Sequence, residues 1–267
     1  MKQIFITGAS AGIGLAIAKA LCDRGDEVWG TSRNPASLPK LPRLRPVQLD
    51  LADPDSIERA FHQALTEAGH FDVVVNNAGS GHFGPGESLP LATIAEQFQV
   101  LVLGQVQLMQ LALGAMRERE KGLIINVTSL ASRLPVPFMA AYNAAKAAMA
   151  SFTMSVQLER PDRRVRVVDL QPGDICTGFN DAVVKTVAAD PRYDARVAKT
   201  WGAVEKNMRA APPPELVARR LLKLIDDVDP PPRVTVGDAF QTNIATLINR
   251  FLPQRVRIWG LKKYYGI

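Results

Sequence analysis

Side chains that form disulfides or bind metals are scarce in this sequence. Its 267 residues include two cysteines, Cys22 and Cys176, and three histidines. Two cysteines do not make a disulfide framework, and the missing HExxH motif argues against a zinc enzyme. We therefore expect no metal site.

Long apolar runs are also missing. The longest apolar segment, from Leu101 to Met116, is interrupted by Gln105, Gln107 and Gln110. A membrane span needs about 18 or more consecutive apolar residues, so none is expected. The N-terminus carries one lysine and a short apolar run before a glycine turn, which predicts a buried strand and not a secretory signal. We expect a cytoplasmic protein.

Acidic residues are missing from the end of the chain. The net charge is +6, and no Asp or Glu follows Asp238. Residues 240–267 instead mix apolar side chains with basic ones, namely Arg250, Arg255, Arg257, Lys262 and Lys263. A helix lying at a membrane interface has this composition. A contact with a partner subunit and closure of a substrate site are alternative interpretations.

Signals for nucleic-acid binding are lacking as well. The sequence has no zinc finger, no aromatic RNA-binding pattern and no basic run longer than two residues. A net positive charge alone is then a weak indication, and no nucleic-acid partner is expected.

What the sequence does contain is a regular alternation of apolar segments of strand length with longer helical patterns. This alternation predicts parallel strands joined by crossover helices. We expect an α/β, doubly wound Rossmann fold with about seven parallel strands in residues 1–238, and a C-terminal extension, 239–267, packed on the same domain. The predicted strands are 3–7, 27–31, 44–49, 71–75, 122–128, 165–170 and 233–236, and the predicted helices are 12–24, 53–68, 91–119, 138–160 and 214–227.

A glycine-rich turn lies between the first strand and the first helix. Its sequence, from Thr7 to Gly14, is TGASAGIG. Glycines allow a tight turn and let backbone N–H groups approach a pyrophosphate, while the helix N-terminus adds its positive dipole end. The turn predicts a dinucleotide site.

Four further segments follow in order. Asp50-Leu51 ends the third strand, Asn76-Asn77-Ala78-Gly79 ends the fourth, Tyr142 and Lys146 form YxxxK, and residues 172–177 read PGDICT. Ser129 precedes Tyr142 by 13 residues. Together these motifs resemble the short-chain dehydrogenase/reductase family over residues 2 to about 236.

The resemblance implies a nicotinamide cofactor, a catalytic Ser129, Tyr142 and Lys146, and assembly as a homodimer or homotetramer through the helices at 91–119 and 138–160. It places the cofactor against Gly8, Ser10, Gly12, Ile13, Gly14, Arg33, Asp50, Leu51, Asn77, Ala78, Gly79, Tyr142, Lys146, Pro172, Gly173, Ile175 and Thr177.

Residues four apart on a helix share one face, so Tyr142 and Lys146 are expected side by side. A free tyrosine has a pKa of about 10, and an adjacent ammonium together with an oxidised nicotinamide favours the phenolate. Tyr142 is then the proton donor to a carbonyl or the base for an alcohol, and Ser129 holds the same oxygen. A hydrolase is not expected, because Ser129 lacks a GxSxG context.

One position departs from the family pattern. The family often has an Asn three residues before Gly104, where it holds a water beside the lysine, and this chain has Leu101. Leucine cannot hold that water. The proton leaves by another route, the enzyme is slow, or the helix keeps its kink by other means.

The end of the second strand predicts the cofactor type. An NAD enzyme usually has an acidic residue here for the ribose 2′-hydroxyl, whereas this chain has Ser32, Arg33 and Asn34. Arg33 suits a 2′-phosphate, with Ser32 and Asn34 as neutral donors. We therefore predict NADP.

Residues 174–213 interrupt the alternation and are expected to cover the substrate. The apolar spacings 183/184/187 and 201/204/208 predict two amphipathic helices on either side of Asp190-Pro191. His82 and Phe83 are candidates for substrate contact, and the pocket wall is predicted to include Leu134, Val136, Pro137 and Met139.

The sequence thus predicts an NADP(H)-dependent oxidoreductase acting on a carbonyl or secondary alcohol of an apolar small molecule. Lipid-, steroid- and retinoid-like compounds are the candidate substrates. The alternative is a catalytically weak NADP-binding sensor or scaffold on the same fold, which Leu101 favours. Peripheral membrane contact through the basic tail is compatible with either function.

Overall fold

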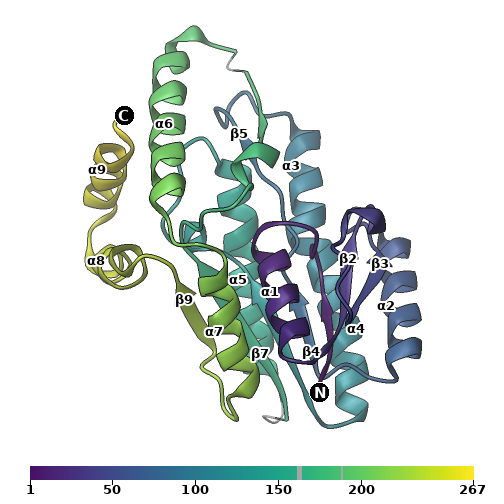
Figure 1. Cartoon of the computed structure of the whole chain (residues 1–267). Helices are drawn as coiled ribbons and strands as arrows, with labels where there is room; N and C mark the ends of the chain where they lie inside the picture. Colours follow the sequence, from purple (N-terminus) through teal and green to yellow (C-terminus); the bar gives the residue numbers. More distant parts are fainter. Residues whose placement is uncertain (161–163, 188) are drawn as a thin grey trace.

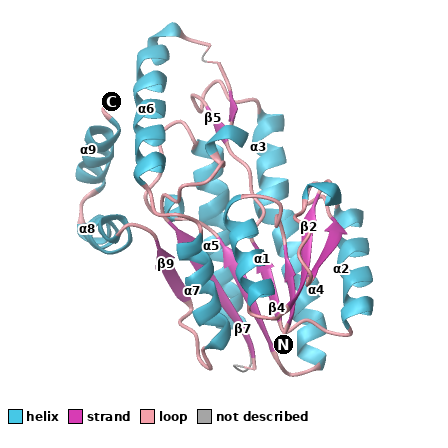
Figure 2. Cartoon of the chain, viewed as in Figure 1, coloured by secondary structure: helices cyan, strands magenta, loops and turns pink. Residues whose placement is uncertain are grey.

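The computed structural model describes residues 1–160, 164–187 and 189–267, without the side chains of residues 244 and 248–250, so Arg250 of the basic tail lies outside the described side chains. A seven-stranded sheet forms the centre (Figures 1 and 2), in the order β3-β2-β1-β4-β6-β7-β9 with all neighbours parallel. The strands are β1 (Gln3–Ile6), β2 (Glu27–Ser32), β3 (Leu44–Gln48), β4 (Val73–Asn76), β6 (Gly122–Val127), β7 (Val165–Pro172) and β9 (Arg233–Val236). The predicted fold class is confirmed.

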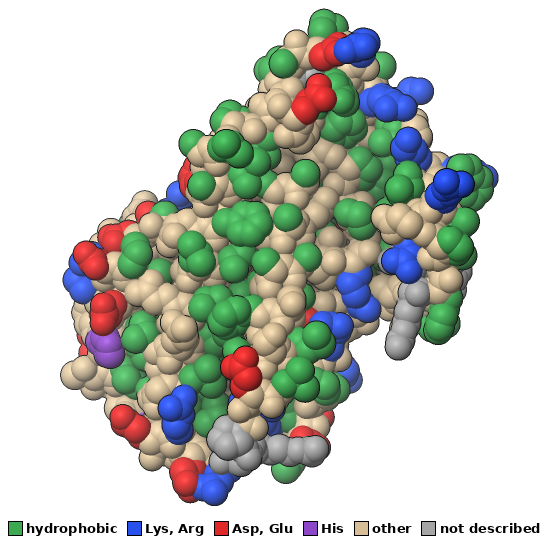
Figure 3. Space-filling model, turned by 180° about the vertical axis from the view of Figure 1, so that it is seen from behind, with side chains coloured by type: hydrophobic (Ala, Val, Ile, Leu, Met, Phe, Trp, Pro, Cys, Tyr) green, Lys and Arg blue, Asp and Glu red, His purple; other side chains and the backbone are tan. Residues whose placement is uncertain are grey.

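Helices cover both faces of the sheet. They are α1 (Gly12–Asp23), α2 (Pro54–Ala68), α3 (Leu91–Phe98), α4 (Gly104–Glu118), α5 (Ala140–Glu159), α6 (Asp194–Ala210) and α7 (Glu215–Asp226), followed by the tail helices α8 (Thr246–Phe251) and α9 (Gln254–Tyr265). One core cluster joins α1 and α7 to the sheet, and a second joins α2, α4 and α5 to the opposite face. The space-filling view in Figure 3 is taken from behind Figure 1, on the side of this second layer.

The first strand shows how alternation builds these two layers. Ile4, Phe5 and Ile6 are all fully buried. Ile4 and Ile6 belong to the α1–α7 core, whereas Phe5 points to the other face, where its ring lies 5.7 Å from that of Phe61 and 5.4 Å from that of Phe71. Successive side chains of a strand alternate between faces, so a continuous apolar strand requires helices on both sides.

Local signals set the helix ends. The Asp53 side chain accepts a hydrogen bond from the Asp55 N–H, Pro54 occupies the first turn of α2, and Gly69 ends the helix at φ 73°. These are the preferred residues at an N-cap, at N1 and beyond a C-terminus. For this reason the predicted helix 53–68 matches α2 closely.

The long helix in the second layer contains a π-turn. The π-turn η2 (Gln99–Leu103) joins α3 to α4. The whole segment Leu91–Glu118 is long and apolar enough to cross a membrane by length and composition. In this fold its Leu108, Met109 and Ala112 are fully buried against the sheet, which accounts for its apolar character.

The segment after β7 differs from the prediction in its first half. Residues 183–187 do not form an amphipathic helix. The short strand β8 (Val184–Lys185) pairs in parallel with β5 (His82–Phe83), and the Thr186 N–H donates to the Phe83 carbonyl at 2.8 Å. Branched valines favour an extended backbone, and a distant partner strand was not visible in the local pattern. The second predicted helix is present as α6, next to α9 in Figure 1.

Candidate active site

A cavity of about 960 Å³ lies at the carboxyl ends of the central strands. The order of the sheet reverses between β1 and β4, and ligands of doubly wound sheets bind at such a point. The catalytic and cofactor-binding residues predicted from the sequence all line this cavity: Gly8, Ser10, Gly12, Ile13, Gly14, Arg33, Asp50, Leu51, Asn77, Ala78, Gly79, Ser129, Tyr142, Lys146, Pro172, Gly173, Ile175 and Thr177.

The glycine turn has no room for side chains at two of its positions. A Cβ at Gly14 would lie 2.0 Å from the Gly8 carbonyl oxygen, and a Cβ at Gly8 would lie 2.9 Å from the Ala78 Cα. Gly8 and Gly12 also have positive φ angles, 69° and 54°. Only glycine meets both demands, and the resulting turn leaves backbone N–H groups at the N-terminus of α1 facing the cavity.

Thr7 ties the loop after β4 to the glycine turn. Its hydroxyl accepts hydrogen bonds from the N–H groups of Asn77 (2.9 Å) and Ala78 (3.0 Å). In return, the Asn77 side-chain amide donates to the carbonyls of Thr7 (2.9 Å) and Gly8 (3.3 Å). The two loops therefore form one rigid rim of the cavity.

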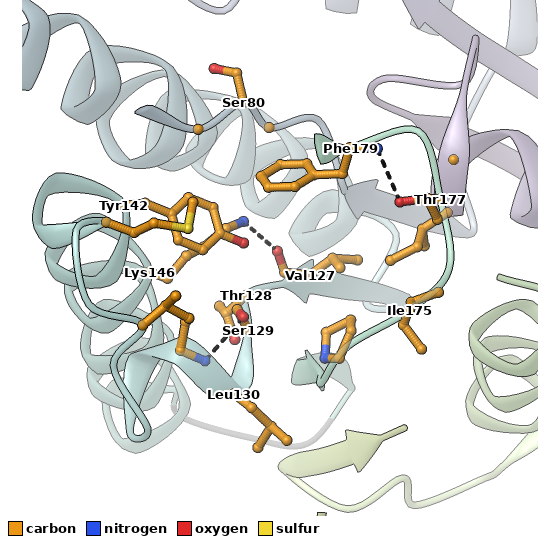
Figure 4. A pocket seen from close by; sticks show the side chains of 18 of the residues that line it. Ser80, Val127, Thr128, Ser129, Leu130, Tyr142, Lys146, Ile175, Thr177 and Phe179 are labelled. Carbon is orange, nitrogen blue, oxygen red and sulfur yellow. Dashed lines mark hydrogen bonds between the residues drawn. The ribbon is translucent and has the colours of Figure 1, made fainter. Parts of the chain in front are cut away.

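Tyr142 and Lys146 reach from α5 toward the end of β6, as Figure 4 shows. Lys146 is buried, and its Nζ donates to the Val127 carbonyl oxygen at 2.9 Å and lies 5.9 Å from the centre of the Tyr142 ring. The Ser129 hydroxyl oxygen accepts from the Ala131 N–H at 3.1 Å, which leaves its proton for another acceptor. The structure thus brings together Ser129, Tyr142 and Lys146.

Burial governs the acidity of both α5 groups. It raises the pKa of Tyr142, an effect opposed by a hydrogen bond from Ser129 and reinforced by the charge of Asp174. Burial lowers the pKa of Lys146 to about 8, with the Asp169 carboxylate opposing the shift. The depression of the Tyr142 pKa expected from Lys146 is absent here, because Lys146 is directed to the Val127 carbonyl. Tyr142 therefore keeps its proton at neutral pH.

Leu101 lies in the π-turn and is fully buried. It packs with Val102 and Ala145, and its Cδ2 is 3.2 Å from where a Cβ of Gly79 would be. The interruption of the helix is thus retained without the asparagine. On either side of the π-turn, Gln97 donates to the Ser80 carbonyl at 3.2 Å and Gln105 to the Ala78 carbonyl at 2.8 Å.

These two glutamines hold the loop that carries Asn77 to Gly79, and the sequence analysis did not recognise their role. No local signal sets them apart, since Gln99, Gln107 and Gln110 lie in the same segment, and only the fold shows that Gln97 and Gln105 are buried. A buried polar side chain needs a hydrogen-bond partner, and here the partners are backbone groups of the cavity rim.

The end of β2 presents Arg33 to the cavity as an exposed side chain. Asn34 instead accepts a hydrogen bond from the Ala36 N–H at 3.1 Å, and the Ser32 hydroxyl lies 3.0 Å from that of Ser37. Both neutral side chains therefore stabilise the local turn. Arg33 is the cationic group at this end of the cavity.

The opposite end of the cavity is apolar. Leu134, Val136 and Met139 line it as predicted, together with Val204 and Met208 of α6. His82 also lines it, whereas among the described residues Phe83 and Pro137 do not. The prediction for Phe83 was wrong because its ring is buried against Trp201, with the ring centres 4.8 Å apart.

The tail completes this apolar end. Ten tail residues line the cavity: Phe240, Gln241, Ala245, Leu252, Val256, Arg257, Gly260, Leu261, Tyr264 and Tyr265. Gln241 joins the tail to the segment after β7, since its Nε2 donates to Asp174 Oδ2 at 2.6 Å and its Oε1 accepts from the Asp174 N–H at 3.1 Å. This pair was not predicted from the sequence, because its members are 67 residues apart in the chain. The only signal was an acid inside the PGDICT segment.

Comparison with known proteins agrees with this geometry. Residues 2–188 match the short chain dehydrogenase family. The 3-ketodihydrosphingosine reductase of Bacteroides thetaiotaomicron is 30% identical over 269 residues, covering 99% of this chain and 98% of that protein. A crystal structure of a short-chain dehydrogenase from Streptomyces avermitilis has a TM-score of 0.84 at 26% identity, covering 98% of each chain. An alcohol dehydrogenase from Thermococcus sibiricus, solved with 5-hydroxy-NADP, has a TM-score of 0.71 at 26% identity, covering 90% of this chain and 97% of that one. With its glycine turn, its YxxxK helix and this match over most of its length, the chain belongs to the short-chain dehydrogenase/reductase family of oxidoreductases.

Proposed function

We propose that this protein is an NADP(H)-dependent oxidoreductase that interconverts a carbonyl and a secondary alcohol of an apolar small molecule. The observation that carries the proposal is that Ser129, Tyr142 and Lys146 line the same cavity as the glycine turn. One end of this cavity suits a dinucleotide and the other an apolar ligand. The three polar groups lie where the two ligands would meet.

The cofactor, when bound, supplies a hydride to the carbonyl carbon or accepts one from the alcohol carbon. In the direction of reduction, the Tyr142 hydroxyl donates its proton to the carbonyl oxygen, and Ser129 donates a hydrogen bond to the same oxygen. Tyr142 carries its proton at neutral pH and can donate it, although the burial that raises its pKa makes it a weaker acid, so a positive charge beside the phenol would assist the transfer. Lys146 positions the end of β6 through the Val127 carbonyl.

The cavity fits NADP by its shape and its charge. The cradle formed by Gly8 and Gly14 would be filled by any Cβ, which suits close approach of a pyrophosphate. Arg33 would hold the 2′-phosphate, and no acidic residue follows it in this turn to bind a 2′-hydroxyl. The adenine and nicotinamide ends would be held by Asp50, Leu51, Asn77, Ala78, Gly79, Pro172, Gly173, Ile175 and Thr177. A related alcohol dehydrogenase was solved with an NADP derivative, which supports the same choice.

The substrate class follows from the apolar end. Side chains such as Met139, Met208 and Leu261 line it, which favours a lipid-, steroid- or retinoid-like substrate. The Bacteroides relative is named as a reductase of 3-ketodihydrosphingosine, and this supports a lipid-like ketone.

Turnover of a panel of apolar ketones and alcohols, followed by the absorbance of reduced nicotinamide, tests the proposal. Tyr142→Phe should reduce turnover by about 100- to 10,000-fold, the usual contribution of a general acid, while NADP still binds. Tyr193→Phe is the matched control. Tyr193 lies in the segment 174–213 above the substrate end, but it is not among the described residues that line the cavity. A protein that binds NADP and turns over no member of the panel would favour the alternative, a binding protein, which the buried Leu101 also supports.

The tail offers a surface for peripheral membrane contact, and we propose that the protein is cytoplasmic and reaches membranes through it. Phe251 and Trp259 are 74% and 62% exposed, and Lys262 and Lys263 lie in the last turn of α9. Apolar and basic groups together bind anionic lipid surfaces. Flotation with phosphatidylserine vesicles tests this, because a Phe251→Glu, Trp259→Glu double variant should stay unbound.

Exposed apolar side chains on α5 support assembly as a homodimer or homotetramer. Leu158 of α5 is 79% exposed and Met154 is 47% exposed. We propose that α4 and α5 form the subunit contact. Sedimentation should show a dimer or tetramer, and Leu158→Glu should shift it toward a monomer.

A further inference from the structure

One charged group in the cavity has no role in the proposed chemistry. Asp174 follows Pro172-Gly173 at the end of β7, and it lines the cavity together with Tyr142. Its charge is close enough to Tyr142 to raise the pKa of the phenol. A carboxylate at this place lies beside the position proposed for the reacting carbonyl.

The carboxylate of Asp174 is oriented but not neutralised. Gln241 makes two hydrogen bonds to this residue, one from its Nε2 to Asp174 Oδ2 and one to its Oε1 from the Asp174 N–H. Within the described part of the chain Asp174 has no ion pair, and its Oδ1 accepts no hydrogen bond. Gln241 thus holds one oxygen in place and leaves the other one available.

The surroundings of Asp174 do not favour its negative charge. Burial raises its pKa, with a contribution from the charge of Asp238, and the hydrogen bond from Gln241 only partly opposes this. An isolated carboxylate in such a place is costly, and a cation beside it would stabilise the anionic form. Burial and the charge of Asp174 raise the pKa values of Tyr264 and Tyr265, so these phenols lie near it, and the same cavity is lined by the apolar Phe179, Val256 and Leu261.

We infer that Asp174 anchors a positively charged amino group of the substrate, so that the cavity takes an apolar-chain α-amino ketone, or the corresponding amino alcohol. This inference rests on the proposed oxidoreductase function and specifies its substrate class. The ammonium group pairs with Asp174 Oδ1, the carbonyl faces Tyr142 and Ser129, and the apolar chain runs along α6 and the tail. The amino group itself is unchanged by the reaction. Reduction forms the secondary alcohol from the ketone, a hydride from the reduced cofactor and the proton of Tyr142.

Two ketones of equal chain length test the inference, one with an α-amino group and one without it. Both chains are kept short enough to remain monomeric in water. The parent should prefer the amino ketone by kcat/KM. Asp174→Asn should reduce that preference by about 10- to 100-fold, the range for a hydrogen bond to a charged group, mainly through KM. Turnover of the neutral ketone should change by a clearly smaller factor than that of the amino ketone, because Asn keeps the shape of the residue and an acceptor for Gln241 while only the amino ketone loses an ion pair.

Glu96→Gln is the matched control. Glu96 of α3 also lines the cavity and is exposed, so this change removes the same charge elsewhere on the wall. It should leave the preference for the amino ketone unchanged. An equal loss for both ketones in Asp174→Asn would overturn the inference and make Asp174 a structural contact of the tail. A parent without preference, or a loss of preference in Glu96→Gln alone, would overturn it as well.

A binding measurement separates this inference from the proposed function. Calorimetry in the presence of NADP measures the affinity for the amino alcohol and for the alcohol that lacks the amino group. This comparison of affinities does not depend on a turnover assay. Tighter binding of the amino alcohol by the parent, lost in Asp174→Asn, supports the anchor even if neither ketone is reduced. Efficient reduction of the neutral ketone without tighter binding of the amino alcohol would support the proposed oxidoreductase function and overturn the role of Asp174 as an anchor of the amino group. Failure of the parent to bind the amino alcohol also rejects it.

Discussion

The two ends of the cavity are built in different ways. At the cofactor end, loops that follow β1 and β4 are joined by short hydrogen bonds through Thr7 and Asn77, and glycines leave no spare volume. At the substrate end, α6 and the tail contribute apolar side chains to the cavity, and the polar contacts of the described residues include Gln241 with Asp174 and with Tyr264, and Asn207 with Tyr264 at 3.0 Å.

This difference reflects the two ligands: the cofactor end binds a ligand of fixed structure, whereas the substrate end can adapt to substrates of different structure. Backbone geometry and hydrogen bonds demand particular residues, so the cofactor end tolerates few substitutions. Apolar packing accepts many residues of similar volume, so the substrate end can change its specificity at small cost. Changes at the cofactor end should therefore have larger effects than changes at the substrate end.

The largest expected effect on stability concerns Lys146, measured without cofactor. Its pKa is lowered from 10.5 to about 8 in the folded protein. Between these pH values the unfolded chain holds a proton that the folded protein has released, so Lys146 raises the free energy of unfolding as pH increases, whereas burial of Cys22, which raises its pKa to about 11, acts in the opposite direction. The rise is about 3 kcal/mol, at about 1.4 kcal/mol per pKa unit. Denaturant titrations of Lys146→Met should lack this rise, and the exposed Lys19→Met should keep it. An identical pH trend in parent and Lys146→Met would contradict the burial effect.

Arg33→Ala tests the charged part of the cofactor end. NADP binding should weaken by about 1.5–3 kcal/mol, because a charge-assisted hydrogen bond to the 2′-phosphate is lost, and NAD binding should change little. Calorimetric titration of both cofactors measures this, with Lys40→Ala as a control for loss of an exposed positive charge. Equal losses for NADP and NAD would exclude the phosphate contact.

Leu101→Asn tests the region between the cofactor end and the substrate end of the cavity, where Leu101 packs near Gly79 and Ala145. We expect a loss of about 1–3 kcal/mol in stability, because a buried amide would replace an apolar side chain without gaining partners. Turnover should not increase. Leu103→Asn is the control, as Leu103 lies in the same π-turn and is 57% exposed. A Leu101→Asn variant that melts like the parent and turns over faster would show that the site accepts a proton path through this position.

The smallest effect is expected at the substrate end. Gln241→Leu removes the contact between the tail and Asp174 and should cost about 1 kcal/mol, seen as faster hydrogen exchange in α9 while the sheet is unaffected. Gln254→Leu, an exposed substitution at the start of α9, should leave exchange unchanged. Global destabilisation in Gln241→Leu would mean that the two ends of the cavity are not independent.

The same difference explains what could be predicted from the sequence. Positive φ angles and close contacts leave glycine as the only choice at Gly8 and Gly14, so the turn is recognisable from its letters alone. The relation of Tyr142 to Lys146 depends only on helical spacing. The central strands were predictable because they are apolar and bounded by turn residues, whereas the edge strand β3 carries Arg45, Pro46 and Gln48.

The contacts that escaped prediction are those between distant segments. Val183 and Val184 have an apolar spacing that fits a helix or a strand, and only pairing with His82 and Phe83, about a hundred residues earlier, decides for a strand. The Asp174–Gln241 pair likewise depends on where the tail returns to the sheet. No periodicity within one segment contains that information.

The π-turn has a consequence for the phase of its helix. Gln97 and Gln105 are eight residues apart, and in an uninterrupted α-helix they would point about 80° apart. A π-turn takes up one extra residue, so the two side chains differ by only about 20°. This alignment lets both amides reach carbonyls of one loop, at Ser80 and Ala78. Closing the π-turn into a regular α-helix without removing a residue would rotate Gln105 by about 100° and release that loop, whereas deleting one residue within Gln99–Leu103 would keep the two amides in phase.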